Sequence, residues 1–265
     1  MMLMTISRLL DFSKTLSGFL ILSLLVSGCQ NGDPIRDGKS TSIKDIQALS
    51  NGNATPTIYY HPVYYTSKPG RNSGPDFLKD INGVVLVKIT KEQVAACGLQ
   101  GSCSVVSGNK MRHYGVHKKV SGVWRFQERK ELPCVYGLGP KNTCVDPFFS
   151  VAADLNIHPL GEVIFIKELE GKVLPTGEVH DGFLIVRDSG PKGVDRFDFF
   201  TGFYNPNDPS NTFVQLGLDD PKNKFHYEKI TGDAAQQVRS RRNFPMLTDA
   251  VVKRGLAEIL ALSNQ

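Results

Sequence analysis

Three aspartates, Asp154, Asp188 and Asp198, could carry acid–base chemistry because each lies beside a strand-like run and a turn. A carboxylic acid delivers a proton to a leaving oxygen only if its pKa is held up, and removal from water raises that pKa. In the segment 196–200 the two-residue period of a strand sends Asp198 to the face opposite Phe197 and Phe199. We therefore predict that the phenylalanines fill a core while Asp198 faces a groove.

The elements that must position these aspartates are mostly short strands. Aromatic or β-branched runs at 57–65, 84–87, 123–126, 183–186 and 213–217 alternate with turns rich in Gly and Pro. Pro62 restricts the first run to an edge, a bulge or a break. A helical turn is expected at 91–97. This pattern favours a mainly β barrel.

A helix is expected at the C-terminus, over 247–263, with Thr248 as its cap. One side of it carries the apolar residues Val251, Val252, Leu256, Ile259 and Leu260. Such a stripe normally packs on the protein's own core, so we expect it to cover the domain.

The aspartate segments resemble the three-aspartate domain of the membrane-bound lytic transglycosylase A family. The resemblance also covers the run Thr57-Ile58-Tyr59-Tyr60-His61-Pro62-Val63, which is similar to the family's first barrel strand. It implies a six-stranded double-psi β-barrel over 57–240, with an elaboration at 66–130 and the C-terminal helix following. The family cleaves peptidoglycan, so the resemblance implies a glycan-cleaving enzyme of the cell wall.

Carried over by position, the family's single catalytic aspartate falls on Asp198, in Arg196-Phe197-Asp198. Its carboxyl would protonate the bond between N-acetylmuramic acid and N-acetylglucosamine. The carboxylate would then take the proton of the muramyl 6-hydroxyl, giving a 1,6-anhydro end without a water nucleophile, metal or cofactor. Asp188 matches the family's Asp-x-Gly and is expected to hold a sugar hydroxyl or to keep the proton on Asp198. Asp154 matches an Asp that precedes a turn and is expected to hydrogen-bond that turn.

The candidate substrate contacts flank these segments and are Tyr60, Gly190, Lys192 and Thr201, of which Lys192 is expected to meet a lactyl or peptide carboxylate. The sequence departs from the family's pattern in two places, and both affect the expected activity. The loop 189–195 is shorter than the family's and contains Pro191, and residues 66–130 are too few for the family's second domain. Two alternatives therefore stay open: a noncatalytic peptidoglycan-binding barrel, and a water-using muramidase in which Asp188 and Asp198 act as a pair.

The N-terminus predicts export and a lipid anchor. Arg8 and Lys14 precede an apolar run of about 11 residues, within the range of a signal-peptide core and too short to span a bilayer. The run ends in Leu25-Val26-Ser27-Gly28-Cys29, which resembles a bacterial lipobox. We expect a signal peptide at 1–28, lipidation of Cys29 and a flexible tether at 29–56. Gln30 favours the outer membrane, facing the periplasm.

Four further cysteines indicate disulfides in an oxidising compartment. Three pairings are possible, and the local one, Cys97–Cys103 with Cys134–Cys144, is favoured because both intervals contain turn residues. No metal site is expected, because Cys-x-x-Cys spacing is absent and the His113–His117 pair contains Gly115, which suggests a loop and not a helix.

The net charge of +5 suits an anionic glycopeptide and is far from a nucleic-acid signature. The expected partners are peptidoglycan strands and, through the anchor, the membrane, with the protein itself a monomer. The basic run at 239–242 is expected to form a solvated face.

Overall fold

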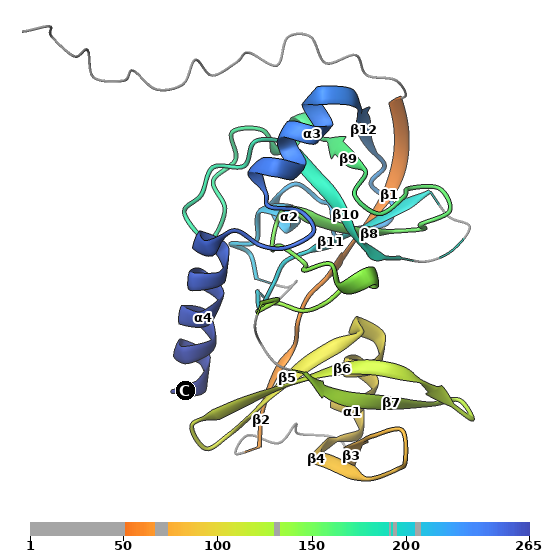
Figure 1. Cartoon of the computed structure of the whole chain (residues 1–265), viewed down its shortest axis with the longest axis vertical. Helices are drawn as coiled ribbons and strands as arrows, with labels where there is room; N and C mark the ends of the chain where they lie inside the picture. The colour runs from red at the N-terminus through yellow and green to blue at the C-terminus, as the bar shows by residue number, and fades with distance from the viewer. Residues whose placement is uncertain (1–50, 67–73, 130–132, 191, 193–194, 205–207) are drawn as a thin grey trace, which may run out of the picture. The chain divides into compact units, whose positions relative to one another are not determined.

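The computed structural model describes residues 51–265 except 67–73, 130–132, 191, 193–194 and 205–207 (Figure 1). The predicted signal peptide at 1–28, the lipidation site Cys29 and the tether as far as residue 50 lie outside the described residues. Residues 51–56, predicted to end the tether, instead belong to the first strand, β1, which spans Asn51–Tyr59.

Six strands form a closed barrel in the order β1-β11-β8-β10-β9-β12. Their bounds are Asn51–Tyr59 (β1), Ser150–Ala153 (β8), Val163–Phe165 (β9), Phe183–Ser189 (β10), Arg196–Phe200 (β11) and Phe225–Ile230 (β12). The pairs β1·β11 and β8·β10 are parallel, and the remaining neighbours are antiparallel. The predicted mainly β fold with a six-stranded barrel is confirmed.

The barrel interior is filled by alternate residues of these strands. Phe197 and Phe199 on β11, together with Leu184 and Val186 on β10, are fully buried in one apolar cluster. Each such side chain contributes roughly 1.5–3 kcal/mol through the area that it removes from water. The two-residue period therefore fills the core with phenylalanines, as predicted, and leaves Asp198 on the outer face.

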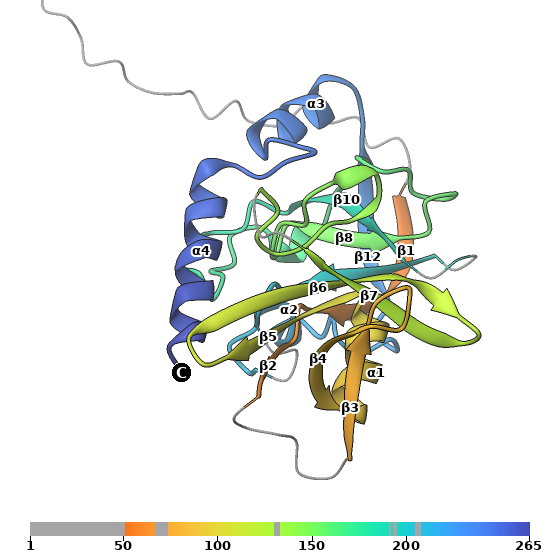
Figure 2. The same ribbon diagram turned by 60° about the horizontal axis from the view of Figure 1, so that its bottom comes forward.

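A second sheet is inserted between β1 and β8, within the same compact unit of the chain, Ile43–Gln265. Its order is β2-β5-β6-β7, with bounds Val63–Tyr65, Ser102–Ser107, Lys110–Val120 and Val123–Arg129. A hairpin of β3 (Pro75–Lys79) and β4 (Val85–Thr90) and the helix α1 (Lys91–Gln100) adjoin it (Figures 1 and 2). The first aromatic run is thus divided at Pro62, which separates a barrel strand from a strand of the second sheet.

Two predictions about this region had different outcomes. The helical turn at 91–97 is confirmed by α1, whose N-cap Thr90 and Gln93 form a reciprocal capping box. The loop predicted around Gly115 was wrong, because His113 and Gly115 lie inside β6, which pairs with β5 and β7. Sheet pairing on both sides outweighs the weak strand propensity of glycine.

The structure after β11 also differs from the secondary structure predicted from the sequence. Residues 213–217, predicted as a last strand, instead overlap the short helix α2 (Thr212–Gln215). The Asn211 side chain accepts from the Phe213 N–H and caps this helix. The last barrel strand is β12, which the sequence analysis did not identify.

Two longer helices follow, α3 (Gly232–Arg241) and α4 (Asp249–Ser263), and 3-10 turns lie at Pro140–Asn142 and Lys167–Leu169. Thr248 caps α4, as predicted. Its apolar stripe joins the core except for Leu260, which is 63% exposed.

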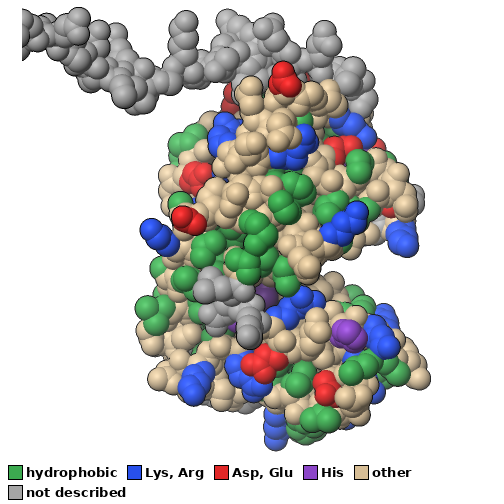
Figure 3. Space-filling view, in the orientation of Figure 1, with side chains coloured by type: hydrophobic (Ala, Val, Ile, Leu, Met, Phe, Trp, Pro, Cys, Tyr) green, Lys and Arg blue, Asp and Glu red, His purple; other side chains and the backbone are tan. Residues whose placement is uncertain are grey.

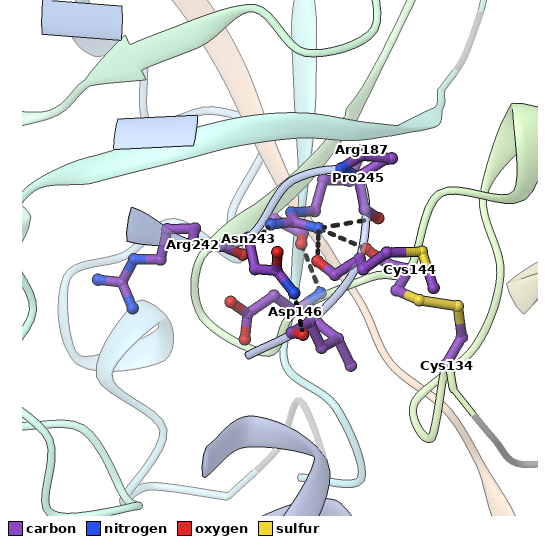
Figure 4. Close-up of a disulfide and its surroundings, with 10 residues drawn as sticks. Cys134, Cys144, Asp146, Arg187, Arg242, Asn243 and Pro245 are labelled. Carbon is purple, nitrogen blue, oxygen red and sulfur yellow. Dashed lines mark hydrogen bonds between the residues drawn. A yellow bond between two sulfur atoms is a disulfide. The ribbon is translucent and has the colours of Figure 1, made fainter. Parts of the chain in front are cut away.

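Both predicted disulfides are confirmed. Cys97–Cys103 joins the end of α1 to β5, and Cys134–Cys144 closes the segment that leads toward β8. The Cys144 end of the second disulfide lies beside Arg187 of β10 (Figure 4).

Candidate functional site

Two of the three aspartates lie in one row on the outer face of the barrel. Ala152 on β8 pairs with Asp198 of β11 on one side and with Asp188 of β10 on the other. Paired residues in a sheet point to the same face, and two strand spacings separate these two by roughly 10 Å. The small Ala152 lies between them on the same face of the sheet.

A β-bulge aims Asp188 at this face. The register of β10 against β8 shifts between Val186 and Asp188, so Arg187 is an extra residue in the ladder. Val186 points into the barrel, and strict alternation would send Asp188 inward as well. The extra residue turns Asp188 to the outside, which is a known use of bulges near functional sites.

The bulge residue Arg187 is itself fully buried and holds this geometry (Figure 4). Its guanidinium donates to the carbonyl oxygens of Cys144 at 2.9 Å, Met246 at 2.8 Å and Arg242 at 3.0 Å. Burial lowers the pKa of Arg187 to about 10, partly offset by the charge of the buried Asp146. The strand that carries Asp188 is therefore fastened to the disulfide segment and to the segment before α4.

Asp188 sits in a partly buried position with both oxygens engaged. Oδ1 accepts from the Ser189 N–H at 2.8 Å, and Oδ2 accepts from the Tyr59 hydroxyl at 3.4 Å. Burial raises the pKa of Asp188 to about 6, with a smaller contribution from the charge of Asp198, against the lowering effect of these two hydrogen bonds. Burial also raises the pKa of Tyr59, so this hydroxyl remains a donor.

Asp198 is engaged on one oxygen. The Arg196 Nε lies 3.2 Å from Oδ1 and also donates to Thr57 Oγ1 at 3.1 Å. The side chain of Asp198 is 19% exposed. Burial raises its pKa and outweighs the lowering effect of Arg196. Among the described residues, no hydrogen bond reaches Oδ2, which leaves that oxygen available for proton transfer.

A pocket of about 310 Å³ lies between the barrel and the second sheet. Its barrel wall contains Tyr59, Asp188 and Ser189, whereas Asp198 is outside the residues that line it. Its volume lies at the lower end of the range for small-ligand sites. Figure 3 shows the surface hollowed between the side chains of the barrel and those of the second sheet.

The opposite wall contains a chain of hydrogen bonds between hydroxyl and imidazole groups. Ser102 Oγ lies 3.1 Å from His61 Nδ1, and Ser104 Oγ lies 2.7 Å from both His61 Nε2 and His113 Nδ1. Burial lowers the pKa of His61 to about 3, and the charge of His113 adds to this effect. His61 is therefore neutral at neutral pH, and the chain of hydrogen bonds ends on the pocket at Ser102.

Sequence analysis missed this wall, although one signal for it was present. Ser102 and Ser104 are two residues apart on a strand, as are His113 and Gly115, so each pair shares a face. What the sequence lacked was the register of β5 against β6, which sets Ser104 opposite His113.

The remaining predicted residues lie around the site in different roles. Asp154 is buried at a turn, where its Oδ1 accepts from the backbone and side-chain N–H groups of Asn156, both at 3.0 Å. Gly190 packs against the Ala153 backbone, which a Cβ would meet at 3.0 Å. Neither residue lines the pocket.

The other three predicted substrate contacts are also outside the pocket lining. Lys192 is exposed at a turn within the segment 189–195. The Tyr60 backbone N–H donates to the Gln100 side chain at 3.1 Å. Thr201 is fully buried, and its hydroxyl donates to the Tyr204 carbonyl at 3.0 Å.

The described residues contain no cluster of three or more His, Cys, Asp or Glu side chains arranged to hold a metal ion. Within the same part of the chain, every helix is too short or too polar to cross a bilayer.

No protein-family model and no curated protein sequence matches the chain. Solved structures of lytic transglycosylases from several species do match it. MltA of Escherichia coli with bound chitohexaose aligns over 68% of this chain and 72% of its own, at 12% identity and a TM-score of 0.45.

The membrane-bound lytic murein transglycosylase of Agrobacterium tumefaciens aligns over 71% of this chain and 76% of its own, at 12% identity and a TM-score of 0.42. The lytic transglycosylase LtgG of Burkholderia pseudomallei aligns over 68% and 71%, at 16% identity and a TM-score of 0.38. At these values the function must be argued from the residues of this chain.

Proposed function

We propose that this chain is a lytic transglycosylase-like lipoprotein that cleaves peptidoglycan between N-acetylmuramic acid and N-acetylglucosamine. The observation that carries the proposal is the pair of outward-facing carboxyl groups, Asp188 and Asp198, both with raised pKa values, on either side of Ala152. One of them lines a pocket, so a polysaccharide can reach this face. Acids with raised pKa values are what glycosidic cleavage requires.

Asp198 is the proposed acid and base. Its protonated carboxyl gives the proton to the glycosidic oxygen as the bond from the muramyl C1 breaks. The resulting carboxylate then takes the proton of the muramyl 6-hydroxyl, whose oxygen bonds to C1 and closes the 1,6-anhydro ring. Asp198 has an oxygen free of hydrogen bonds within the described residues, whereas both oxygens of Asp188 are engaged. This difference supports Asp198 for proton transfer.

Asp188 is proposed to position the sugar and to disfavour ionisation of its neighbour. The two carboxyl groups are close enough to interact, since the Asp198 charge contributes to the raised pKa of Asp188. Asp154 is proposed to support the turn after β8. Tyr60, Gly190 and Lys192 stay as predicted contacts of a longer glycan. The predicted contact at Thr201 is not proposed again, because that residue is fully buried and its hydroxyl donates to the Tyr204 carbonyl.

The proposed location follows from the N-terminal sequence. Lipidation of Cys29 would tether the domain to the outer membrane, facing the periplasm, within reach of the cell wall. We propose that it works there as a monomer on glycan strands. Labelled palmitate should enter the wild-type protein and not a Cys29→Ala variant; equal labelling of the two would contradict the anchor.

Digestion of purified sacculi, followed by mass spectrometry of the products, tests the activity. We expect 1,6-anhydro ends from the wild-type protein and a loss of about 10²–10⁴-fold in Asp198→Asn, the usual contribution of a general acid or base. The matched control is Asp219→Asn, which changes an exposed aspartate outside the pocket lining. Cleavage that survives in Asp198→Asn would remove the assignment.

The products also separate the alternatives. Reducing ends would indicate a water-using muramidase in which both aspartates act. Binding of sacculi without any product would indicate a noncatalytic barrel.

A further inference from the structure

Arg129, at the end of β7, lines the same pocket as Asp188 but on the opposite wall. It is partly buried, and burial lowers its pKa, yet an arginine remains cationic at neutral pH. Within the described part of the chain, no carboxylate pairs with it, and no charge appears among the causes of its pKa shift. Partial removal of a guanidinium from water without a counter-ion is unfavourable, and its place on the pocket wall points to a ligand that supplies one.

The sheet is built to hold this side chain against the pocket wall. Arg129 pairs with His113 across β6 and leans over Gly115, where an added Cβ would collide with its Nε. The absence of a side chain at Gly115 therefore gives the guanidinium its place. The neighbouring acid, Glu128, alternates to the other face of the sheet, where Arg112 Nε donates to it at 2.8 Å.

We propose that Arg129 is an anion subsite that binds a carboxylate of the substrate, so that the pocket distinguishes acidic, peptide-bearing glycan from neutral glycan. The identity of this carboxylate, a stem-peptide carboxyl group, rests on the proposed function. A planar guanidinium can bind a carboxylate with two parallel hydrogen bonds. The second sheet then selects the substrate, while the barrel carries the proposed proton-transfer group, Asp198.

Binding of a defined ligand tests this subsite without cleavage. The probes are a disaccharide-tetrapeptide muropeptide and the same compound with its carboxyl groups converted to amides. Titration into the Asp198→Asn protein measures binding alone. We expect that protein to bind the native muropeptide about tenfold more tightly than the amidated one, the ratio that a net 1.4 kcal/mol gives.

Two variants and a control locate the effect. Arg129→Gln in the same background should bring the ratio to about one, because the charge-assisted contact is lost. Gly115→Ala should reduce it by displacing the guanidinium while keeping the charge. Arg125→Gln removes an arginine that lies earlier on the same strand and outside the pocket lining, so it should keep the ratio.

An unchanged ratio in Arg129→Gln would overturn the subsite, as would a protein that binds the two ligands equally well before mutation. Failure to bind either ligand would overturn the proposed function together with the subsite. Equal binding of both ligands therefore identifies failure of the subsite alone.

Discussion

The two walls of the pocket differ in chemistry although burial acts on both. On the barrel wall burial raises the pKa of Asp188 to about 6, and on the sheet wall it lowers the pKa of His61 to about 3. Burial penalises the charged form in each case, so it raises the pKa of the acid and lowers the pKa of the base. Both groups then favour their uncharged forms. The barrel wall gains a carboxyl group that can exchange a proton near neutral pH, whereas the sheet wall gains a neutral imidazole for hydrogen bonding.

The walls also differ in how they are fixed. The barrel wall depends on a bulge whose extra residue, Arg187, donates to four backbone carbonyls, those of Cys144, Arg242, Pro245 and Met246. The sheet wall depends on a chain of side-chain hydrogen bonds through Ser104. Loss of the Arg187 contacts should disturb both the fold and the position of Asp188. Loss of the hydrogen bonds of Ser104 should act mainly on binding.

Arg187→Met should have the largest effect on stability. It removes a buried guanidinium. The backbone carbonyl oxygens then lose their hydrogen-bond donor, and the buried Asp146 loses a nearby positive charge. We expect a loss of about 3–5 kcal/mol in the free energy of unfolding, measured by urea denaturation. Arg241→Met is the control, because that side chain is 52% exposed in a surface ion pair and should cost less than about 1 kcal/mol. Similar losses in both variants would refute the special role of the bulge.

Asp188→Asn should stabilise the protein in a pH-dependent way. A carboxyl whose pKa is raised in the folded state binds its proton more tightly there, so wild-type stability falls as pH rises from about 4 to about 6. The amide cannot ionise, so the variant should gain up to about 3 kcal/mol over wild type at pH 8 and little below pH 4. Urea denaturation across this range measures the gain, and a gain that is constant with pH would contradict the raised pKa.

The two disulfides allow a direct comparison of the walls. Replacing either pair of cysteines by serine should cost roughly 2–3 kcal/mol, because both close short loops. Only the loss of Cys134–Cys144 should also lower glycan cleavage, because Arg187 donates to the Cys144 carbonyl. Removal of Cys97–Cys103 alters the second sheet and should leave the rate at saturating substrate unchanged. If both replacements changed the rate at saturating substrate equally, the specific link between Cys134–Cys144 and the barrel wall would be contradicted.

Ser104→Ala should have the smallest effect. It interrupts the chain between His61 and His113 without changing the lining of the pocket. We expect a loss of about 1–3 kcal/mol in stability from the buried groups that lose a partner, and a higher KM with kcat unchanged. A fall in kcat alone would instead place this chain in the proton transfer.

Several features could be predicted from the sequence because they depend on local patterns. Alternation over residues 196–200 was enough to bury Phe197 and Phe199 and to turn Asp198 outward. Turn residues between nearby cysteines were enough to favour both disulfides. Thr248 marked the start of the C-terminal helix, because a cap acts within one turn.

Other features depend on partners that are distant in the chain. Residues 213–217 read as a strand, but the cap at Asn211 and the packing of Phe213 in the barrel core give a helix. The run at 239–242 read as a solvated face, yet Arg242 stacks 3.3 Å from the Phe149 ring and pairs with Glu178 and Asp181. Leu260 read as part of the apolar stripe and is exposed.

The sequence by itself determined which residues can donate protons, which strands alternate and where the chain turns, because these properties act between near neighbours. Only the tertiary structure decided that a bulge at Arg187 turns Asp188 outward and that Arg129 and Ser102 face it across a pocket. Register and sheet pairing join residues far apart in the chain. The pKa of an acid then depends on how far those distant residues exclude water from it.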